Sequence, residues 1–120
     1  LRRRYREMSA SILAKRDRMA LDNGMQLRLL SAMEVLQARR EAEELSQGER
    51  ERALCSNACL LARALETQEG KPVFSGGLEV LSGLRVEEIA ALAGIWSRFN
   101  REENPSLIMA QEQAEELKKN

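Results

Sequence analysis

The sequence predicts an all-α fold: a single small domain, residues 1–120, of about five to six helices with a loop containing glycine and proline near residues 70–77. Two observations lead to this fold class. Helix formers such as Leu, Ala, Met, Glu and Arg dominate, whereas aromatic residues make up only 3% of the chain. Apolar residues also recur at the spacing of helix faces along most of the sequence. A chain of 120 residues fits one domain with one modest core.

Two helices are predicted in the N-terminal part, over residues 3–21 and 25–45. Asp22, Asn23 and Gly24 lie between them and are typical of a turn that ends one helix and begins another. The apolar face of the first helix consists of Tyr5, Met8, Ile12 and Met19. The core-facing stripe of the second consists of Met25, Leu29, Met33 and Leu36.

The third helix is predicted to be the central core helix. It begins at a capping box, because Ser46 and Glu49 match the S-x-x-E pattern, and ends near Gly70. Cys55 and Cys59 lie in it four residues apart and are expected to be buried thiols without a disulfide between them. Its apolar stripe consists of Leu54, Ala58, Leu61, Ala62 and Leu65.

A predicted loop over residues 71–77 separates this helix from a short helical turn over residues 78–84. The loop carries Val73 and Phe74 as an apolar anchor. In the short turn, the side chains expected to point inward are those of Leu78, Leu81 and Leu84.

The next helix is predicted over residues 86–101, and a last one over residues 106–118. Leu84 and Ile89 match a hydrophobic staple around the start of the first of these. Asn104 and Pro105 are typical of the N-cap and first position of the last helix. The core face of the helix at residues 86–101 consists of Ile89, Leu92, Ala93, Trp96 and Phe99.

The formal charge is balanced, with 19 basic and 19 acidic residues, but it is divided along the chain. Residues 1–40 carry ten Lys and Arg against four Asp and Glu, so the helices up to residue 45 form a basic part. Residues 46–120 are more acidic. Such a chain can pair its two parts within one subunit or between subunits, and we expect the protein to self-associate.

Motifs that carry chemistry are few. The sequence has no histidine, no phosphate-binding loop and no dinucleotide fingerprint, and two thiols fall short of a four-ligand zinc site. We therefore expect a non-enzymatic protein without a metal or cofactor. No apolar run approaches the roughly 20 residues of a membrane span, and no stretch has the order of a signal peptide, so a cytoplasmic protein is expected.

Residues 86–105 resemble part of a DNA-binding helix-turn-helix, which gives the alternative function of a transcriptional regulator. Ala90 and Gly94 match the first helix and the turn. Asn100 and Glu103, however, stand where the second helix needs apolar residues, and the excess of acidic residues in this stretch opposes phosphate binding. We therefore expect one continued helix here and no salt-dependent DNA binding.

Four segments, taken in their order, resemble small phage and prophage tail assembly chaperones. The likeness covers roughly the C-terminal half, and Arg85 departs from it where a Thr or Ser cap is expected. The segments are NACLLARAL (57–65), GKPVFSGGLEVLSGL (70–84), VEEIAALAGIWSRFN (86–100) and NPSL (104–107).

The resemblance implies a non-enzymatic helical protein of the bacterial host cytoplasm. Such a protein binds the tape measure protein and helps tail-tube subunits assemble around it. A divided charge and several methionines suit a surface that accommodates varied apolar helices. The structural or partner-contact candidates are Phe74, Leu81, Ile89, Trp96, Phe99, Asn104 and Pro105.

Overall fold

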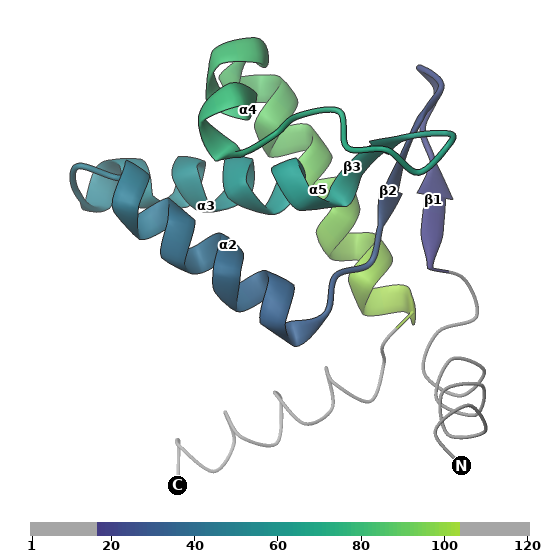
Figure 1. The fold of residues 1–120 in the computed structure, drawn as a ribbon, viewed down its shortest axis with the longest axis horizontal. Coiled ribbons are helices and arrows are strands. Elements are labelled where there is room, and N and C mark those ends of the chain that lie inside the picture. The colour runs from purple at the N-terminus through teal and green to yellow at the C-terminus, as the bar shows by residue number, and fades with distance from the viewer. Residues whose placement is uncertain (1–16, 104–120) are drawn as a thin grey trace, which may run out of the picture.

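The computed structural model describes residues 17–103, which form four helices and a three-stranded antiparallel sheet (Figure 1). The predicted all-α fold is therefore wrong, and the described residues form a small mixed α/β domain. Residues 1–16 and 104–120, with Asn104, Pro105 and the predicted last helix, lie outside the described residues. The strands are β1 (Arg18–Ala20), β2 (Met25–Arg28) and β3 (Leu65–Thr67); the helices are α2 (Ala32–Leu45), α3 (Glu49–Ala64), α4 (Gly77–Gly83) and α5 (Val86–Glu103).

The sheet replaces the end of the first predicted helix and the start of the second. β1 and β2 form a hairpin, and β2 also pairs with β3, so the strand order is β1-β2-β3. Gly24 adopts the left-handed conformation with φ 80°, and Asn23 Oδ1 accepts a hydrogen bond of 3.2 Å from the amide of Met25. Glycine adopts this left-handed conformation without steric cost and is common in the loops of hairpins. Residues 22–24 thus form a turn, as predicted, but it joins two strands.

Helix α2 begins later than predicted, at Ala32, because Ser31 caps it. The Ser31 hydroxyl accepts a hydrogen bond from the amide of Glu34, and the Glu34 carboxylate accepts one from the amide of Ser31, which completes a capping box. The predicted stripe is therefore wrong: Met25 lies in a strand, and Met33 and Leu36 are exposed.

The capping box predicted at Ser46 and Glu49 is also wrong. Gly48 is the N-cap of α3, and no side chain caps that helix. Ser46 instead ends α2, and its hydroxyl donates a hydrogen bond of 2.7 Å to the carbonyl of Gly48. Ser46 therefore stabilises the turn between the two helices.

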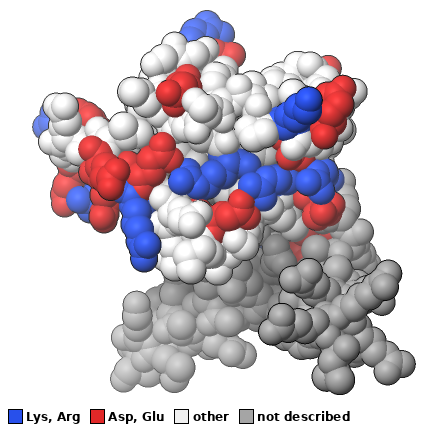
Figure 2. All heavy atoms as spheres, viewed as in Figure 1, with Lys and Arg blue, Asp and Glu red and all other residues white. Residues whose placement is uncertain are grey.

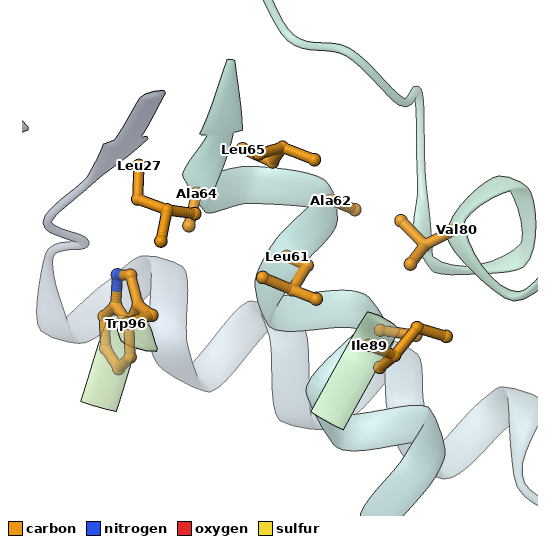
Figure 3. Packing of buried hydrophobic residues seen from close by; sticks show 9 residues of the cluster. Leu27, Leu61, Ala62, Ala64, Leu65, Val80, Ile89 and Trp96 are labelled. Carbon is orange, nitrogen blue, oxygen red and sulfur yellow. The ribbon is translucent and has the colours of Figure 1, made fainter. Parts of the chain in front are cut away.

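Helix α3 is the centre of the domain, as predicted, although it ends at Ala64 and the chain continues directly into β3. It packs against α2, α4 and α5 (Figure 1). In Figure 3, Leu61 lies between Leu27 and Trp96 on one side and Val80 and Ile89 on the other. The main core therefore joins α3 to the sheet, α4 and α5.

A second, smaller core cluster joins α2 to α3. It consists of Ala38, Ala42, Cys55 and Cys59, whose small side chains let the two helices approach closely. Both cysteines are buried and free, which confirms the prediction for them. Burial raises the pKa of the Cys59 thiol to about 12, with a further contribution from Glu41.

The short helix α4 buries a different side chain from those predicted. Val80 is completely buried, whereas Leu78 is 56% exposed; Leu81 and Leu84 are partly buried against the core.

Helix α5 runs without interruption through Gly94, and its predicted core residues Ile89, Ala93, Trp96 and Phe99 are buried. Glu88 accepts a hydrogen bond of 3.0 Å from the amide of Arg85 at its start. Among residues 17–103, no helix has the length and apolar character needed to cross a membrane.

Gly77, at the start of α4, is expected to be intolerant of a side chain. A Cβ built there would collide with Cys59 Sγ and lie 3.3 Å from Cys59 Cα, so Gly77→Ala should destabilise the fold by about 1–3 kcal/mol in urea denaturation. Adding Cys59→Ala removes the closest contact and should restore part of this loss.

Gly94→Ala is the matched control, because a Cβ there meets nothing within 4 Å in the middle of α5. It should stabilise the helix by about 0.5–1 kcal/mol. Equal effects at the two glycines would show that the packing of α4 on Cys59 does not limit the space at Gly77.

Candidate partner-binding groove

A groove of about 540 Å³ lies between α2, α3 and α5. Its wall on the α2 side includes Leu30, Val35 and Leu36, and the opposite side includes Leu60 of α3 and Trp96 of α5. Arg39, Ser56 and Asn100 add polar groups to the lining. An apolar lining with a few polar groups is typical of a binding site for another molecule.

Trp96 is the rigid part of this groove. It is 7% exposed, and its Nε1 donates a hydrogen bond of 2.8 Å to the carbonyl of Arg28, the last residue of β2. This bond satisfies the polar atom of the ring and ties α5 to the sheet. The position of the indole is therefore fixed by the end of β2.

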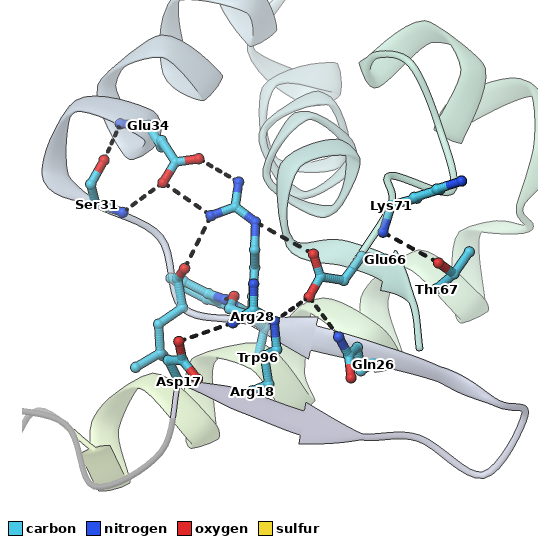
Figure 4. A network of polar contacts seen from close by, with 11 residues as sticks. Asp17, Arg18, Gln26, Arg28, Ser31, Glu34, Glu66, Thr67, Lys71 and Trp96 are labelled. Atoms are coloured by element: carbon cyan, nitrogen blue, oxygen red, sulfur yellow. Dashed lines mark hydrogen bonds and ion pairs between the residues drawn. The ribbon is translucent and has the colours of Figure 1, made fainter. Parts of the chain in front are cut away.

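Arg28 also fixes the other wall of the groove (Figure 4). Its guanidinium forms a two-point ion pair with Glu34, in which Nη1 lies 3.1 Å from Oε1 and Nη2 bonds to Oε2. Because Glu34 lies in the first turn of α2, this pair attaches the start of α2 to the sheet. One arginine thus holds α2 through its side chain and α5 through its carbonyl.

The buried carboxylate of Glu66 supports this arrangement from β3. Glu66 is only 4% exposed, and its Oε1 accepts hydrogen bonds from Arg18 Nε at 2.6 Å and from Gln26 Nε2 at 2.7 Å. Its Oε2 lies 4.0 Å from Arg28 Nε. Figure 4 shows these side chains converging on Glu66 from β1 and β2. The carboxylate therefore connects all three strands.

The ion pair at Glu34 makes part of the stability depend on pH. The Arg28 hydrogen bonds lower the pKa of Glu34 from 4.5 to about 2, against the opposing effect of burial and with help from the amide of Ser31. A folded-state pKa below the unfolded one gives stability that is complete above the unfolded pKa and is lost as pH falls. We expect a loss on the order of 2 kcal/mol between about pH 4.5 and pH 2 from this group.

Glu34→Gln is the variant that isolates this effect, because glutamine also fits the capping box. The stability difference between the natural chain and the variant, measured by urea denaturation, should shrink as pH falls from about 5 to about 2. A difference that stays constant over this range would show that the Arg28 pair does not stabilise the start of α2.

The far half of α2 is attached to α3 by a second ion pair and to α4 by a hydrogen bond. Arg63 Nη1 lies 2.6 Å from Glu41 Oε1, and the amide of Gly77 donates a hydrogen bond of 2.8 Å to Glu41 Oε2. Burial by itself raises the pKa of Glu41, but these two hydrogen bonds outweigh it and hold the pKa below its ordinary value. Helix α2 is therefore held by one ion pair in its first turn and another in its second half.

Exposed apolar side chains extend the groove onto the surface. Met33 is 58% exposed and Leu36 is 44% exposed, although both belong to a helix that is polar over its second half.

On the face shown in Figure 2, a row of basic side chains crosses the middle of the molecule and acidic side chains lie beside it. The described part of this face therefore presents charges of both signs.

The predicted contact residues within the described part of the chain separate into three groups, while Asn104 and Pro105 lie outside it. Trp96 lines the groove; Ile89 and Phe99 are 1% exposed core residues; Phe74 and Leu81 are partly buried against the core. The sequence did not indicate the other groove residues as contacts: Ser56 and Leu60 of α3, Asn100 of α5, and the residues of the α2 wall. The S-x-x-E pattern at Ser31 and Glu34 was a signal for the true start of that wall.

No protein-family model, curated protein or solved structure matches this chain.

Proposed function

We propose that this protein is a non-enzymatic tail assembly chaperone, and that it binds an apolar helix of the tape measure protein in the groove between α2, α3 and α5. The observation that carries the proposal is the groove itself, with Leu36 on its wall and Met33 exposed beside it. Exposed apolar side chains beside an apolar groove indicate a surface that another chain covers. The identity of the partner rests on the resemblance of residues 57–107.

The groove suits a row of side chains on one face of a helix. Its walls are themselves helices, and its volume of about 540 Å³ accommodates several apolar side chains. An amphipathic helix presents such side chains at positions i, i+3, i+4 and i+7. Arg39 lines the same groove, so acidic residues beside the apolar row of the partner are favoured.

The polar groups support a structural role better than catalysis or DNA binding. The buried carboxylate of Glu66 is held by Arg18 and Gln26, and Glu34 and Glu41 are each held by an arginine. Helix α5 is continuous through Gly94, so residues 86–103 contain no turn at the position a helix-turn-helix needs. The geometry therefore favours a binding protein over a transcriptional regulator.

The proposal is tested with the full-length chain and overlapping fragments of a tape measure protein from the same phage or prophage. We expect a complex in size-exclusion chromatography with light scattering, and less aggregation of the fragments when this protein is present. Absence of both at micromolar concentrations would contradict the proposed function.

Leu36→Asp locates the binding surface. Leu36 is 44% exposed, so the substitution should change stability by less than about 1 kcal/mol, while it places a charge against the apolar face of the partner. We expect at least a tenfold weaker complex by isothermal titration calorimetry, about 1.4 kcal/mol.

Leu78→Asp is the matched control, because Leu78 is 56% exposed on α4, outside the groove lining. It should leave the affinity unchanged. Equal losses in the two variants would place the partner on a different surface.

A further inference from the structure

The groove between α2, α3 and α5 lies close to the point where the described chain ends. Asn100 lines the groove, and α5 ends three residues later at Glu103. Three helical residues advance the chain by about 4.5 Å. The chain therefore leaves α5 near the mouth of the groove, and 17 further residues follow Glu103.

The sequence beyond Glu103 contains apolar and acidic residues, which suit an apolar groove with an arginine in its lining. It reads NPSLIMAQEQAEELKKN, with three consecutive apolar residues followed by a segment rich in glutamate. Pro105 cannot lie inside a continuing helix, and the residue before a proline is disfavoured in helical conformation, so the sequence predicts a change of direction at Asn104. Four residues from Glu103 to Leu107 can span up to about 13 Å.

The charges of the two terminal segments favour the C-terminal one as the occupant of the groove. Arg39 lines the groove, and the following residue of α2, Arg40, is exposed. Residues 104–120 contain Glu112, Glu115 and Glu116 against two lysines, whereas residues 1–16 contain six basic residues and one acidic residue. An acidic segment is attracted to the arginines and a basic one is repelled.

We propose that residues 104–120 occupy this groove of the same molecule when no partner is bound, with Leu107, Ile108 and Met109 against the apolar lining. The contact between residues 104–120 and the groove does not depend on which partner the protein binds. Its consequence rests on the proposed function: the segment competes with the partner helix, so the groove is covered until the partner displaces it. A chain that binds apolar helices is then protected from binding itself through an uncovered apolar surface.

The first test is disulfide cross-linking in the full-length chain without any partner. Leu36→Cys combined with Ile108→Cys should form an intramolecular disulfide when oxidised glutathione is added at low protein concentration. Leu78→Cys combined with Ile108→Cys is the control, because Leu78 is also an exposed leucine on a helix but lies outside the groove lining. The natural Cys55 and Cys59 are buried, and burial raises the pKa of both thiols, so they react slowly.

A disulfide that forms much faster in the double variant with Leu36→Cys than in the one with Leu78→Cys supports the proposal. Equal rates for the two double variants would overturn it. Disulfides formed only between molecules would also overturn it, and would assign the groove to a second copy of the chain.

The second test concerns competition. Ile108→Asp should release the segment and strengthen binding of a tape measure fragment by up to about tenfold, if the segment covers the groove about nine-tenths of the time. Leu78→Asp adds the same charge outside the groove lining and should leave the affinity unchanged. An unchanged affinity in Ile108→Asp would overturn the competition. Failure of every variant to bind any fragment contradicts the proposed function, while the cross-link still decides whether the segment occupies the groove.

Discussion

Trp96→Ala should destabilise the fold by about 3–5 kcal/mol, the range for removing a large aromatic side chain from a core. The indole is 7% exposed and packs in the main core with Leu27 and Leu61. Its removal also leaves the carbonyl of Arg28 without the hydrogen bond from Nε1. The effect should therefore combine a cavity between α5 and the sheet with the loss of a buried polar contact.

Urea denaturation followed by far-ultraviolet circular dichroism measures this loss, since the variant has no tryptophan to report by fluorescence. Trp96→Phe separates the two contributions, because it keeps most of the apolar volume and removes the hydrogen bond; about 1–2 kcal/mol is expected. Val86→Ala is the control on the same helix, at a side chain that is 59% exposed, and should change stability by less than about 0.5 kcal/mol. Unchanged stability in Trp96→Ala, with partner binding lost, would instead make Trp96 an interface residue only.

The helical part of the fold could be predicted where apolar residues repeat over several turns. In α3 and α5 the predicted stripes include Ala58, Leu61, Ile89 and Phe99, all of which are buried. These helices are 16 and 18 residues long, so the helical period repeats often enough to identify the buried face.

The sheet could not be predicted by the same pattern, because its strands contain only three or four residues. Asn23 and Gly24 favour a hairpin, yet they also suit a break between helices, and the flanking methionines and leucines are good helix formers. Leu65 continues the apolar stripe of α3 but pairs with Leu27 across the sheet. Tertiary pairing therefore overrides local helix propensity at both places.

The groove could be predicted only in part. The sequence predicts Trp96 from the apolar stripe over residues 86–101. It places Met33 and Leu36 on the core-facing stripe of a helix over residues 25–45, whereas the helix begins at Ala32 and both side chains are exposed. An apolar stripe looks the same in sequence whether the domain or a partner covers it. Only the positions of α3 and α5 show that this face of α2 forms the wall of a groove.

Glu66→Ala should have the second large effect, because it removes the acceptor that joins the three strands. The carboxylate is 4% exposed, and without it Gln26 and Arg28 lose a buried partner, while Arg18 stays 45% exposed and keeps its access to water. Removing one partner of a fully buried ion pair costs about 3–5 kcal/mol. We expect about 2–3 kcal/mol here, since Arg18 is solvated and Arg28 retains Glu34.

Glu66→Gln distinguishes the charge from the hydrogen bonds. Its amide oxygen can still accept from Arg18 or Gln26, so the loss should be about half that of Glu66→Ala in urea denaturation. Glu69→Ala, at an exposed position in the turn after β3, is the control and should change stability by less than about 0.5 kcal/mol.

Glu66→Ala should also speed amide hydrogen exchange at the start of α2. The reason is that Arg28, which Glu66 contacts, binds Glu34 through its side chain and accepts the hydrogen bond of Trp96 at its carbonyl. Faster exchange in the strands alone, with α2 unaffected, would show that the sheet does not position the groove.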